Sequence, residues 1–537
     1  MRVAPGTSLP QELLRRGLPA FLARQRWFGG KARSIGSVET LDIIPMADER
    51  VSAELVLALV RYADHEPDEA YCIPLLSAHD AGSSGFGEHW AVPAAAEDEW
   101  ALRDAALEPR FLSLLLKAIE RGLVFRGSHG EVRATSTSAF RRMGGPFARE
   151  LTPSLLKGEQ SNNSVVFGDR FVLKLLRLVK EGINPELEIG TFLTERARGA
   201  RVPPVAGSIV YYGPGSVPRT LGILESFVPN QGNAWDYTLQ ALTDYLARVA
   251  TAAELKIAPL GHNAAWPRLA DEEPPPEAQA LLGSFLSAAG LLGRRTAELH
   301  LALASDSSDP NFAPEPFSAA YLLALQRSMM EQCARVFELL RGQLANLPET
   351  VLPQAQKLLG LQTSVEDRLQ SFVERSSDGA RIRIHGDYHL GQVLCSDGDF
   401  TIIDFEGEPA RPLAERRAKR SPLQDVAGML RSFHYAAQRG TRDWLQQQGG
   451  KPDSVSDTKK WIRFWTHWVS SRFMSAYLDT NRNNSFLPRS TGATAALLNI
   501  YLLNKAIYEL GYELNNRPDW VTIPTEGILE ILGAESS

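Results

Sequence analysis

The sequence predicts an α+β protein with a strand-rich first part and a mainly helical second part. Short runs of β-branched and apolar residues, typical of strands, recur before residue 229. Residues 316–376 instead carry a strongly helical pattern without any strand signal. The strand-like runs lie at 38–44, 53–61, 71–76, 164–176 and 221–228. Helices are expected at 98–122, where leucines share one face, and later at 416–437 and 494–520.

Length and composition limit the classes of protein to consider. The 537 residues suffice for two to four domains, and 44% hydrophobic with 22% charged residues is ordinary for a soluble globular protein. The 57 basic and 63 acidic residues leave a net charge of −6, so neither nucleic acid nor an anionic membrane is an expected partner. Three widely spaced cysteines, no signal-peptide pattern and no apolar stretch long enough to span a bilayer predict a cytoplasmic protein with reduced thiols.

The most informative stretch is IHGDYHLGQVLCSDGDFTIIDFEGEP, residues 384–409. Its two β-prone runs flank a turn of Asp and Gly residues, so we expect a short hairpin. The hairpin would bring Asp387 and Gln392 close to Asp404 and Glu406. Two acids and an amide on short strands suit a hard divalent cation and a phosphate.

The chemistry of phosphoryl transfer assigns a role to each of these side chains. Asp387 would accept the proton of an attacking hydroxyl, while Gln392 and Asp404 would hold Mg²⁺. An ordinary hairpin with aspartates at its turns is the plain alternative. The length of the combined pattern favours a site.

A second group of candidates lies on a predicted hairpin at 164–176, whose turn is Gly168-Asp169. Lys174 stands among apolar residues of its second strand, where a lone lysine usually points to solvent at an edge. In a kinase it would contact phosphates and pair with a helix glutamate. The next helix begins with Asn184 as cap and a proline in its first turn. Glu186 and Glu188 both qualify as partners of Lys174, and we choose Glu188.

Two further helices carry polar side chains of interest. Asp425, near the start of the helix at 416–437, suits the helix dipole and could also support the catalytic loop. We prefer the dipole role. In the last helix four polar or aromatic residues share one face, which would either line a sugar site or be solvated. They are Lys505, Tyr508, Glu509 and Tyr512. Trp461, Trp465 and Trp468 recur at helical spacing and are expected in the core.

The motifs HGDYHLGQ and IIDFEGEP resemble the catalytic and metal loops of aminoglycoside-phosphotransferase-like kinases, relatives of protein kinases. Gln392 and the GEP sequence are similar to bacterial maltokinases, as are RWFGGKAR near the start, GINPELEIGTFLTE and the final RPDW. The resemblance thus touches nearly the full length. It implies a bilobal protein-kinase-like fold with an N-terminal α+β cap (1–95), a β-rich nucleotide-binding subdomain (96–228) and a helical C-terminal lobe (229–537).

The same resemblance implies a function and further site residues. The expected reaction makes maltose 1-phosphate from maltose and ATP with Mg²⁺, which feeds glycogen-type α-glucan synthesis. The resemblance also implies a trehalose-isomerising enzyme as a partner. ATP would be bound by a polar loop in place of glycines, by Lys174 with Glu188, and by backbone groups near Glu225 and Phe227. The loop residues are Ser161, Asn162, Asn163 and Ser164. On the substrate side we place His385, His389, Glu406, Lys505 and Tyr512, with His385 expected to hold loop backbone rather than to transfer protons.

Two other functions stay open from the sequence. The first is a kinase of another small acceptor, such as glucosamine or an aminoglycoside, although an aminoglycoside site should be more acidic than the last helix suggests. The second is a catalytically silent protein that binds sugar or nucleotide beside an α-glucan enzyme. The presence of Asp387, Gln392, Asp404 and Lys174 together argues against a silent protein.

Overall fold

The computed structural model describes ten stretches of the chain, which form two compact units. The stretches are 11–64, 67–76, 92–93, 101–143, 151–156, 162–197, 199–251, 273–375, 378–447 and 458–533. The first unit comprises Met1–Arg196, Pro203–Pro229 and Arg411–Leu413, and the second comprises Ala197–Val202, Asn230–Ala410 and Ala414–Ser537. The expected division of the first part near residue 95 stays a prediction.

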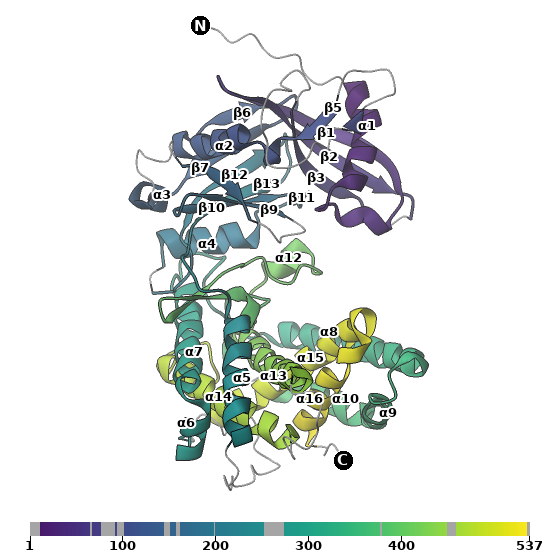
Figure 1. Ribbon diagram of the computed structural model, residues 1–537, viewed down its shortest axis with the longest axis vertical. Coiled ribbons are helices and arrows are strands. Elements are labelled where there is room, and N and C mark those ends of the chain that lie inside the picture. Colours follow the sequence, from purple (N-terminus) through teal and green to yellow (C-terminus); the bar gives the residue numbers. More distant parts are fainter. Residues whose placement is uncertain are drawn as a thin grey trace. The chain divides into compact units, whose positions relative to one another are not determined.

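The first unit contains two antiparallel sheets. One has the strand order β1-β2-β3-β5-β4, and helix α1 (Gln11–Arg24) packs against β1 (Figure 1). Short β11 (Leu178–Val179) pairs with β3 of this sheet, although it directly follows a strand of the other sheet. The two sheets are therefore joined by continuous chain. The strands are β1 (Ile35–Ala47), β2 (Ser52–Tyr62), β3 (Glu69–Leu76), β4 (Val92–Pro93) and β5 (Ala101–Asp104).

The second sheet has seven strands in the order β6-β7-β12-β13-β10-β9-β8. Helix α2 (Pro109–Arg121) packs against it with a fully apolar face, and α4 (Pro185–Glu195) lies on β12. The predicted hairpin at 164–176 is confirmed as the β9–β10 pair. The strands are β6 (Val124–Arg126), β7 (Glu131–Ser136), β8 (Pro153–Leu155), β9 (Asn162–Phe167), β10 (Phe171–Leu176), β12 (Val205–Tyr212) and β13 (Arg219–Ser226), and α3 (Ser138–Met143) follows β7.

The helix that the spacing of leucines favours over 98–122 begins later than the pattern suggests. Residues Ala101–Asp104 form β5 instead, because Leu75 and Leu76 of β3 offer them an open ladder. The helix starts only at Pro109, where Glu108 caps the Arg110 N–H and proline suits the first turn. Sheet pairing therefore overrides the local helical pattern.

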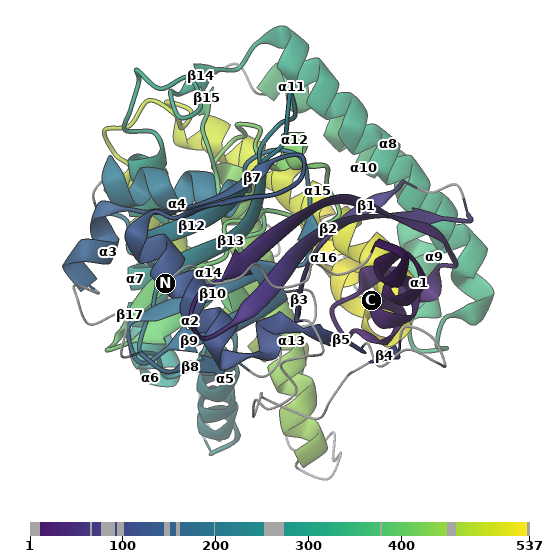
Figure 2. The same ribbon diagram turned by 90° about the horizontal axis from the view of Figure 1, so that it is seen from above.

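The second unit is helical, apart from two small two-stranded sheets. Helix α13 lies at its centre and packs against α5, α14 and α15, while α14 runs along α7 (Figure 1). Helix α8 packs on α10 and α15 (Figure 2). The helices are α5 (Ala234–Thr251), α6 (Pro276–Leu282), α7 (Ser284–Leu303), α8 (Ala319–Gln343), α9 (Leu352–Gly360), α10 (Gln362–Gln370), α11 (Phe372–Arg375), α12 (Leu413–Arg416), α13 (Leu423–Gln447), α14 (Thr458–Thr480), α15 (Thr491–Asn516) and α16 (Thr522–Leu532). One of these small sheets pairs β14 (Glu315–Pro316) with β15 (Ala380–Arg381), and the other is the hairpin of β16 (Val393–Ser396) and β17 (Asp399–Ile402).

Two of the three tryptophans of α14 lie in the core as the sequence predicts, whereas Trp461 is only partly buried. Trp465 is fully buried and Trp468 is 6% exposed, so both belong to the core of the second unit. Among the described residues, no helix is long and apolar enough to cross a membrane.

The contact between α7 and α14 depends on a glycine and gives a first prediction. A Cβ atom on Gly293 would lie 2.1 Å from the Phe473 carbonyl oxygen. Alanine normally favours a helix over glycine by ~1 kcal/mol. We expect Gly293→Ala to destabilise the protein instead, by about 1–3 kcal/mol, because the backbones must move apart. The free energy of unfolding from urea titrations measures the change.

The matched control is Gly342→Ala in α8, where a Cβ atom would meet nothing within 4 Å. This variant should be neutral or slightly more stable, in line with helix propensity. A Gly293→Ala variant as stable as the control variant would show that α7 and α14 do not pack this closely.

Candidate active site

In the first unit Lys174 is held by a buried carboxylate. It projects from β10 and forms an ion pair with Glu186 at the start of α4, whose side chain is fully buried. The Glu225 carboxylate lies 3.9 Å from the same ammonium. Lys174 is 16% exposed, so it is not the solvent-facing edge lysine of the plain interpretation. The ammonium on β10 is thus fixed beside two acids, and its contact with phosphates stays a prediction.

The choice of Glu188 as partner of Lys174 is wrong, because the ion pair that the structure shows is with Glu186. The predicted cap is confirmed: the Asn184 side-chain oxygen accepts the Glu186 N–H at 2.8 Å. Capping fixes Glu186 in the first helical turn, with its side chain directed at β10. The sequence could not decide between two acids two residues apart, since their directions depend on how α4 docks on the sheet.

The strand expected to meet adenine is β13, which lies between β10 and β12. Glu225 pairs with both neighbouring strands, so its backbone belongs to the sheet. The Phe227 N–H donates to the Arg170 carbonyl at 2.7 Å. The Phe227 N–H is therefore already used in a hydrogen bond of the first unit. The expected contact of Phe227 with adenine would have to involve its carbonyl group.

Only part of the polar loop 161–164, which precedes the β9–β10 hairpin, belongs to the residues that the structure describes. Ser161 lies outside the described residues, whereas Asn162, Asn163 and Ser164 begin β9. The side-chain oxygen of Asn163 accepts a hydrogen bond from Arg177 Nε at 2.6 Å. Ser164 is opposite Lys174 in the β9–β10 ladder and is buried. Their role toward ATP stays a prediction.

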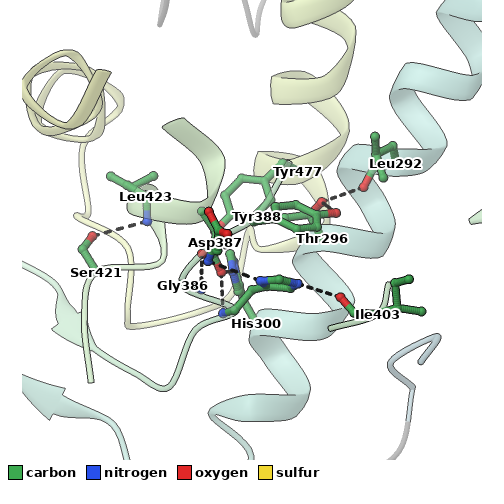
Figure 3. Close-up of polar contacts among 12 residues, drawn as sticks. Leu292, Thr296, His300, Gly386, Asp387, Tyr388, Ile403, Ser421, Leu423 and Tyr477 are labelled. Carbon is green, nitrogen blue, oxygen red and sulfur yellow. Dashed lines mark hydrogen bonds and ion pairs between the residues drawn. The ribbon is translucent and has the colours of Figure 1, made fainter. Parts of the chain in front are cut away.

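In the second unit the loop that carries Gly386, Asp387 and Tyr388 (Figure 3) is held by a buried carboxylate of α13, that of Asp425. Asp425 Oδ2 accepts the His385 N–H at 2.8 Å, and Oδ1 accepts the Gly386 N–H at 2.9 Å. The sequence interpretation preferred a helix-dipole role for Asp425. The structure shows the other alternative, support of the loop immediately before Asp387.

A buried polar chain continues from Asp425. His300 of α7 lies with Nε2 3.0 Å from Asp425 Oδ2 and with Nδ1 2.9 Å from the Tyr477 hydroxyl of α14. Because an ionised carboxylate only accepts, Nε2 carries the proton and Tyr477 donates to Nδ1. Burial alone would raise the pKa of Asp425, but the hydrogen bonds from the His300 ring and from the Gly386 N–H lower it below its usual value. The carboxylate therefore stays ionised inside the protein.

His385 joins the two loops of the site through its ring. Its Nε2 atom lies 2.9 Å from the Ile403 carbonyl, and its Nδ1 atom accepts the Asp387 N–H at 3.4 Å. Nε2 must donate, so the ring is neutral and both nitrogens are used by backbone. With 1% exposure, His385 is not available to substrate. Its place among the substrate-side residues is wrong, and its expected role in holding the loop is what the geometry shows.

The predicted hairpin is present as β16–β17, and it brings the candidate metal ligands together. The Ile403 N–H donates to the Gln392 carbonyl at 3.0 Å, so Ile403 lies opposite Gln392 and Asp404 follows as the next residue. Asp404 has a φ of 67°, a left-handed conformation that is costly without glycine and common at functional sites. Carboxylate oxygens of Asp404 and Glu406 lie within 4.8 Å of each other. An all-oxygen set of this kind fits a hard divalent cation.

Helix α15 contributes a cation to the surroundings of the loop. Burial lowers the pKa of His389, and the positive charge of Lys505 lowers it further, while Asp387 and Asp404 act in the opposite direction. His389 Nδ1 accepts the Gly391 N–H at 3.0 Å, which requires that nitrogen to be unprotonated. Lys505 itself lies 4.7 Å from the centre of the Tyr508 ring. Lys505 and His389 thus share one electrostatic environment, and their roles toward substrate stay predictions.

The rest of the predicted α15 face divides between two roles. Glu509 forms a buried ion pair with Arg431 of α13, at 2.7 Å, and therefore ties two helices together. Tyr512 is 47% exposed, and its ring lies under Arg517, 5.4 Å away. The role of Tyr512 toward sugar stays a prediction.

Sequence reasoning gave no role to His300 and Tyr477, and none to Thr296, which accepts the Tyr388 hydroxyl at 2.9 Å. A sign was present: Thr296 and His300 are spaced i, i+4 on the face of α7 that is otherwise apolar and buried. A polar pair on a buried face needs partners. Which partners they are depends on the loop of Tyr388 and on α13 and α14, all 92 or more residues later in the chain.

Comparison with known proteins gives two family matches. Residues 153–455, more than half of the chain, match the phosphotransferase enzyme family. Residues 21–106 match the maltokinase N-terminal cap domain. Together they bear out the resemblance to maltokinase-like members of the protein-kinase-like superfamily.

Individual relatives carry another name. A glucosamine kinase of Streptacidiphilus jiangxiensis is 24% identical over 70% of this chain and 72% of its own length. One of Mycolicibacterium smegmatis is 26% identical over 71% and 79%. A solved glucosamine kinase in complex with glucosamine, ADP and inorganic phosphate has a TM-score of 0.61 at 19% identity, covering 98% of both chains. That structural likeness confirms the kinase-like fold, and the fold alone.

The Asp425 contacts predict a strong effect of a small change. Asp425→Asn keeps one acceptor but replaces the other by an N–H₂ group that faces donors. We expect a loss of about 1–3 kcal/mol in stability and roughly a 100-fold lower kcat, because the loop before Asp387 shifts. Thermal unfolding and steady-state phosphoryl transfer measure the two effects.

Asp443→Asn, on the same helix in an exposed i, i+4 pair with Arg439, is the matched control and should change neither quantity. Normal kcat in Asp425→Asn would contradict the supporting role.

Proposed function

The chain belongs to the phosphotransferase enzyme family, and from that premise we propose that it transfers the γ-phosphoryl group of ATP to maltose. The anomeric hydroxyl oxygen attacks the γ-phosphorus, the bond to the ADP oxygen breaks, and the hydroxyl proton passes to Asp387. The products are maltose 1-phosphate and ADP. The match of residues 21–106 to the maltokinase N-terminal cap domain supports this choice.

The observation that carries the choice of acceptor is the charge of Lys505 beside the catalytic loop. Its positive charge reaches His389, two residues from Asp387. A neutral sugar presents only hydroxyls, which an ammonium can bind as a donor. An amino sugar carries its own positive charge at neutral pH and would be repelled at this position. Lys505 therefore favours a neutral acceptor such as maltose.

The other site residues would position the reacting groups and bind Mg²⁺ and the phosphates. Asp387 orients the acceptor hydroxyl and takes its proton, and Asp425 and His385 hold the backbone on both sides of it. Gln392 and Asp404, with Glu406 nearby, would hold Mg²⁺ through oxygen atoms. When bound, Mg²⁺ neutralises charge that develops between the β- and γ-phosphates. In the first unit Lys174, fixed by Glu186, contacts the phosphates.

Glucosamine is the second candidate acceptor, because two curated relatives with that name align with about 70% of this chain. At 24% and 26% identity, acceptor preference can differ between relatives on the same scaffold. In the maltose case the product would serve α-glucan synthesis, with a trehalose-isomerising enzyme as a source of maltose.

The test of the acceptor is ADP release with Mg·ATP and a panel of maltose, trehalose, glucose, glucosamine and kanamycin, followed by phosphorus NMR of any product. We expect maltose-dependent release with an anomeric phosphate. In Lys505→Met the ratio of kcat/KM for glucosamine to that for maltose should rise roughly tenfold, or ~1.4 kcal/mol. Lys505→Arg keeps the charge and should leave the ratio near that of the wild type.

Two results would point elsewhere. Preference of the wild type for glucosamine, unchanged in Lys505→Met, would replace maltose by the second candidate. If none of the compounds in the panel stimulates ADP release, neither maltose nor glucosamine is the acceptor.

Removal of the proposed base gives a separate prediction. Asp387→Asn should fold normally and lose about 10²–10⁴ in kcat, the usual contribution of a positioned acid or base. Asp397→Asn is the control on the same hairpin: Asp397 is exposed and has a φ of 51°, a conformation that asparagine adopts readily. Rapid-quench measurement of a single turnover separates the chemical step from product release. Near wild-type turnover in Asp387→Asn would exclude Asp387 as the base.

A further inference from the structure

Arg177 is a large, almost fully buried charged residue directly after β10. It is 1% exposed, and its Nη2 atom lies 2.6 Å from Asp104 Oδ2 in an equally buried ion pair. Asp104 ends β5 and also caps the 3-10 helix that follows, by accepting the Ala106 N–H at 3.0 Å. The buried carboxylate and guanidinium thus join β5 of the first sheet to β10 of the second.

The same guanidinium makes a second directed bond, to the strand expected to lead away from the phosphate-covering loop. Its Nε atom donates to Asn163 Oδ1 at 2.6 Å. Asn163 stands opposite Leu175 in the β9–β10 ladder, next to the pair formed by Ser164 and Lys174. Arg177 therefore holds the start of β9 beside the end of β10, one ladder position from Lys174.

A third contact comes from the RWFGGKAR motif, to which neither the fold nor the proposed chemistry gives a role. The Trp27 ring lies 4.5 Å from the Arg177 guanidinium carbon, in a cation–π arrangement. A backbone hydrogen bond also joins Arg177 to β3 of the first sheet, since the Cys72 N–H donates to the Arg177 carbonyl at 2.8 Å. After Arg177 the chain enters the first sheet as β11.

These contacts cross between the two family matches within one unit. Trp27 and Asp104 lie in the residues that match the cap domain, whereas Asn163 and Arg177 lie in those that match the phosphotransferase family. The planar guanidinium has fixed donor directions, so it can specify where Asn163 lies relative to β5. A buried ion pair is weak support for stability, because apolar residues of similar volume often do as well. An apolar pair would fill the same volume but would lack the directed hydrogen bonds that the Arg177 guanidinium makes.

We propose that Arg177 is a positioning residue through which the cap, by Trp27 and Asp104, sets the geometry of the strands that contact the nucleotide phosphates. The proposal rests on the proposed function, in which β9 and Lys174 serve ATP. The cap then acts on the nucleotide half of the reaction rather than on the acceptor. Loss of the contacts should weaken nucleotide binding and leave acceptor binding unchanged.

The test replaces the ion pair as a whole, because Arg177→Met alone would leave Asp104 buried and unpaired. The double variant Arg177→Met with Asp104→Leu keeps the volume apolar and should unfold within a few degrees of the wild type. We expect the Kd for a fluorescent N-methylanthraniloyl ADP and the KM for ATP to rise about tenfold each, with the acceptor KM within twofold. Asn163→Ala, which leaves the ion pair intact, should change the same two quantities in the same direction.

The matched control is Lys117→Met with Asp48→Leu, which removes another ion pair of the first unit, with Nζ and Oδ2 3.0 Å apart. This pair joins α2 to the turn between β1 and β2, and its loss should leave the affinity for the ADP probe unchanged. If the Arg177 double variant folds and binds the probe like the wild type, or if both KM values rise equally, the positioning role is wrong. A wild-type protein that binds no probe overturns the proposed function and this inference with it.

Discussion

The second unit depends on one buried carboxylate, that of Asp425. Its two oxygens accept two backbone N–H groups of the catalytic loop and the ring N–H of His300. Water is excluded there, so each bond is strong and each missing bond would be expensive. A loop residue that must meet a reacting hydroxyl has to be held more exactly than a loop can hold itself. Through Asp425 the loop is hydrogen-bonded to α13, the central helix of the unit, which holds its backbone in place.

In the first unit charges are fixed in the same way, in pairs that remove their conformational freedom. Lys174 is held by Glu186 and lies 3.9 Å from Glu225, and Arg177 is held by Asp104 and Asn163. Both cations are on or directly after β10. Preorganised charge costs little reorganisation when a phosphate arrives, which is the main way in which a protein assists phosphoryl transfer.

The family match of the cap and the names of the relatives point to different acceptors. The cap match points toward maltokinases, and the named relatives are glucosamine kinases. Overall similarity at this level establishes the scaffold and the shared chemistry, while specificity depends on a few side chains near the acceptor. The charge of Lys505, which helps to lower the pKa of His389, is a local property of this chain and belongs to the kind of feature on which such specificity depends.

The sequence by itself determined the elements and much of the chemistry. The β9–β10 hairpin, the Asn184 cap, the β16–β17 hairpin with Gln392 and Asp404, and the buried tryptophans all follow from local patterns of turns, caps and periodicity. Only the tertiary structure decided which partners meet: Glu186 rather than Glu188 at Lys174, His385 on backbone, His300 and Tyr477 behind Asp425, and a strand at 101–104 where a helix was predicted. Local rules depend on residues a few positions apart. Partners in a buried network are chosen by the packing of elements that are distant in the chain, and no local pattern records that packing.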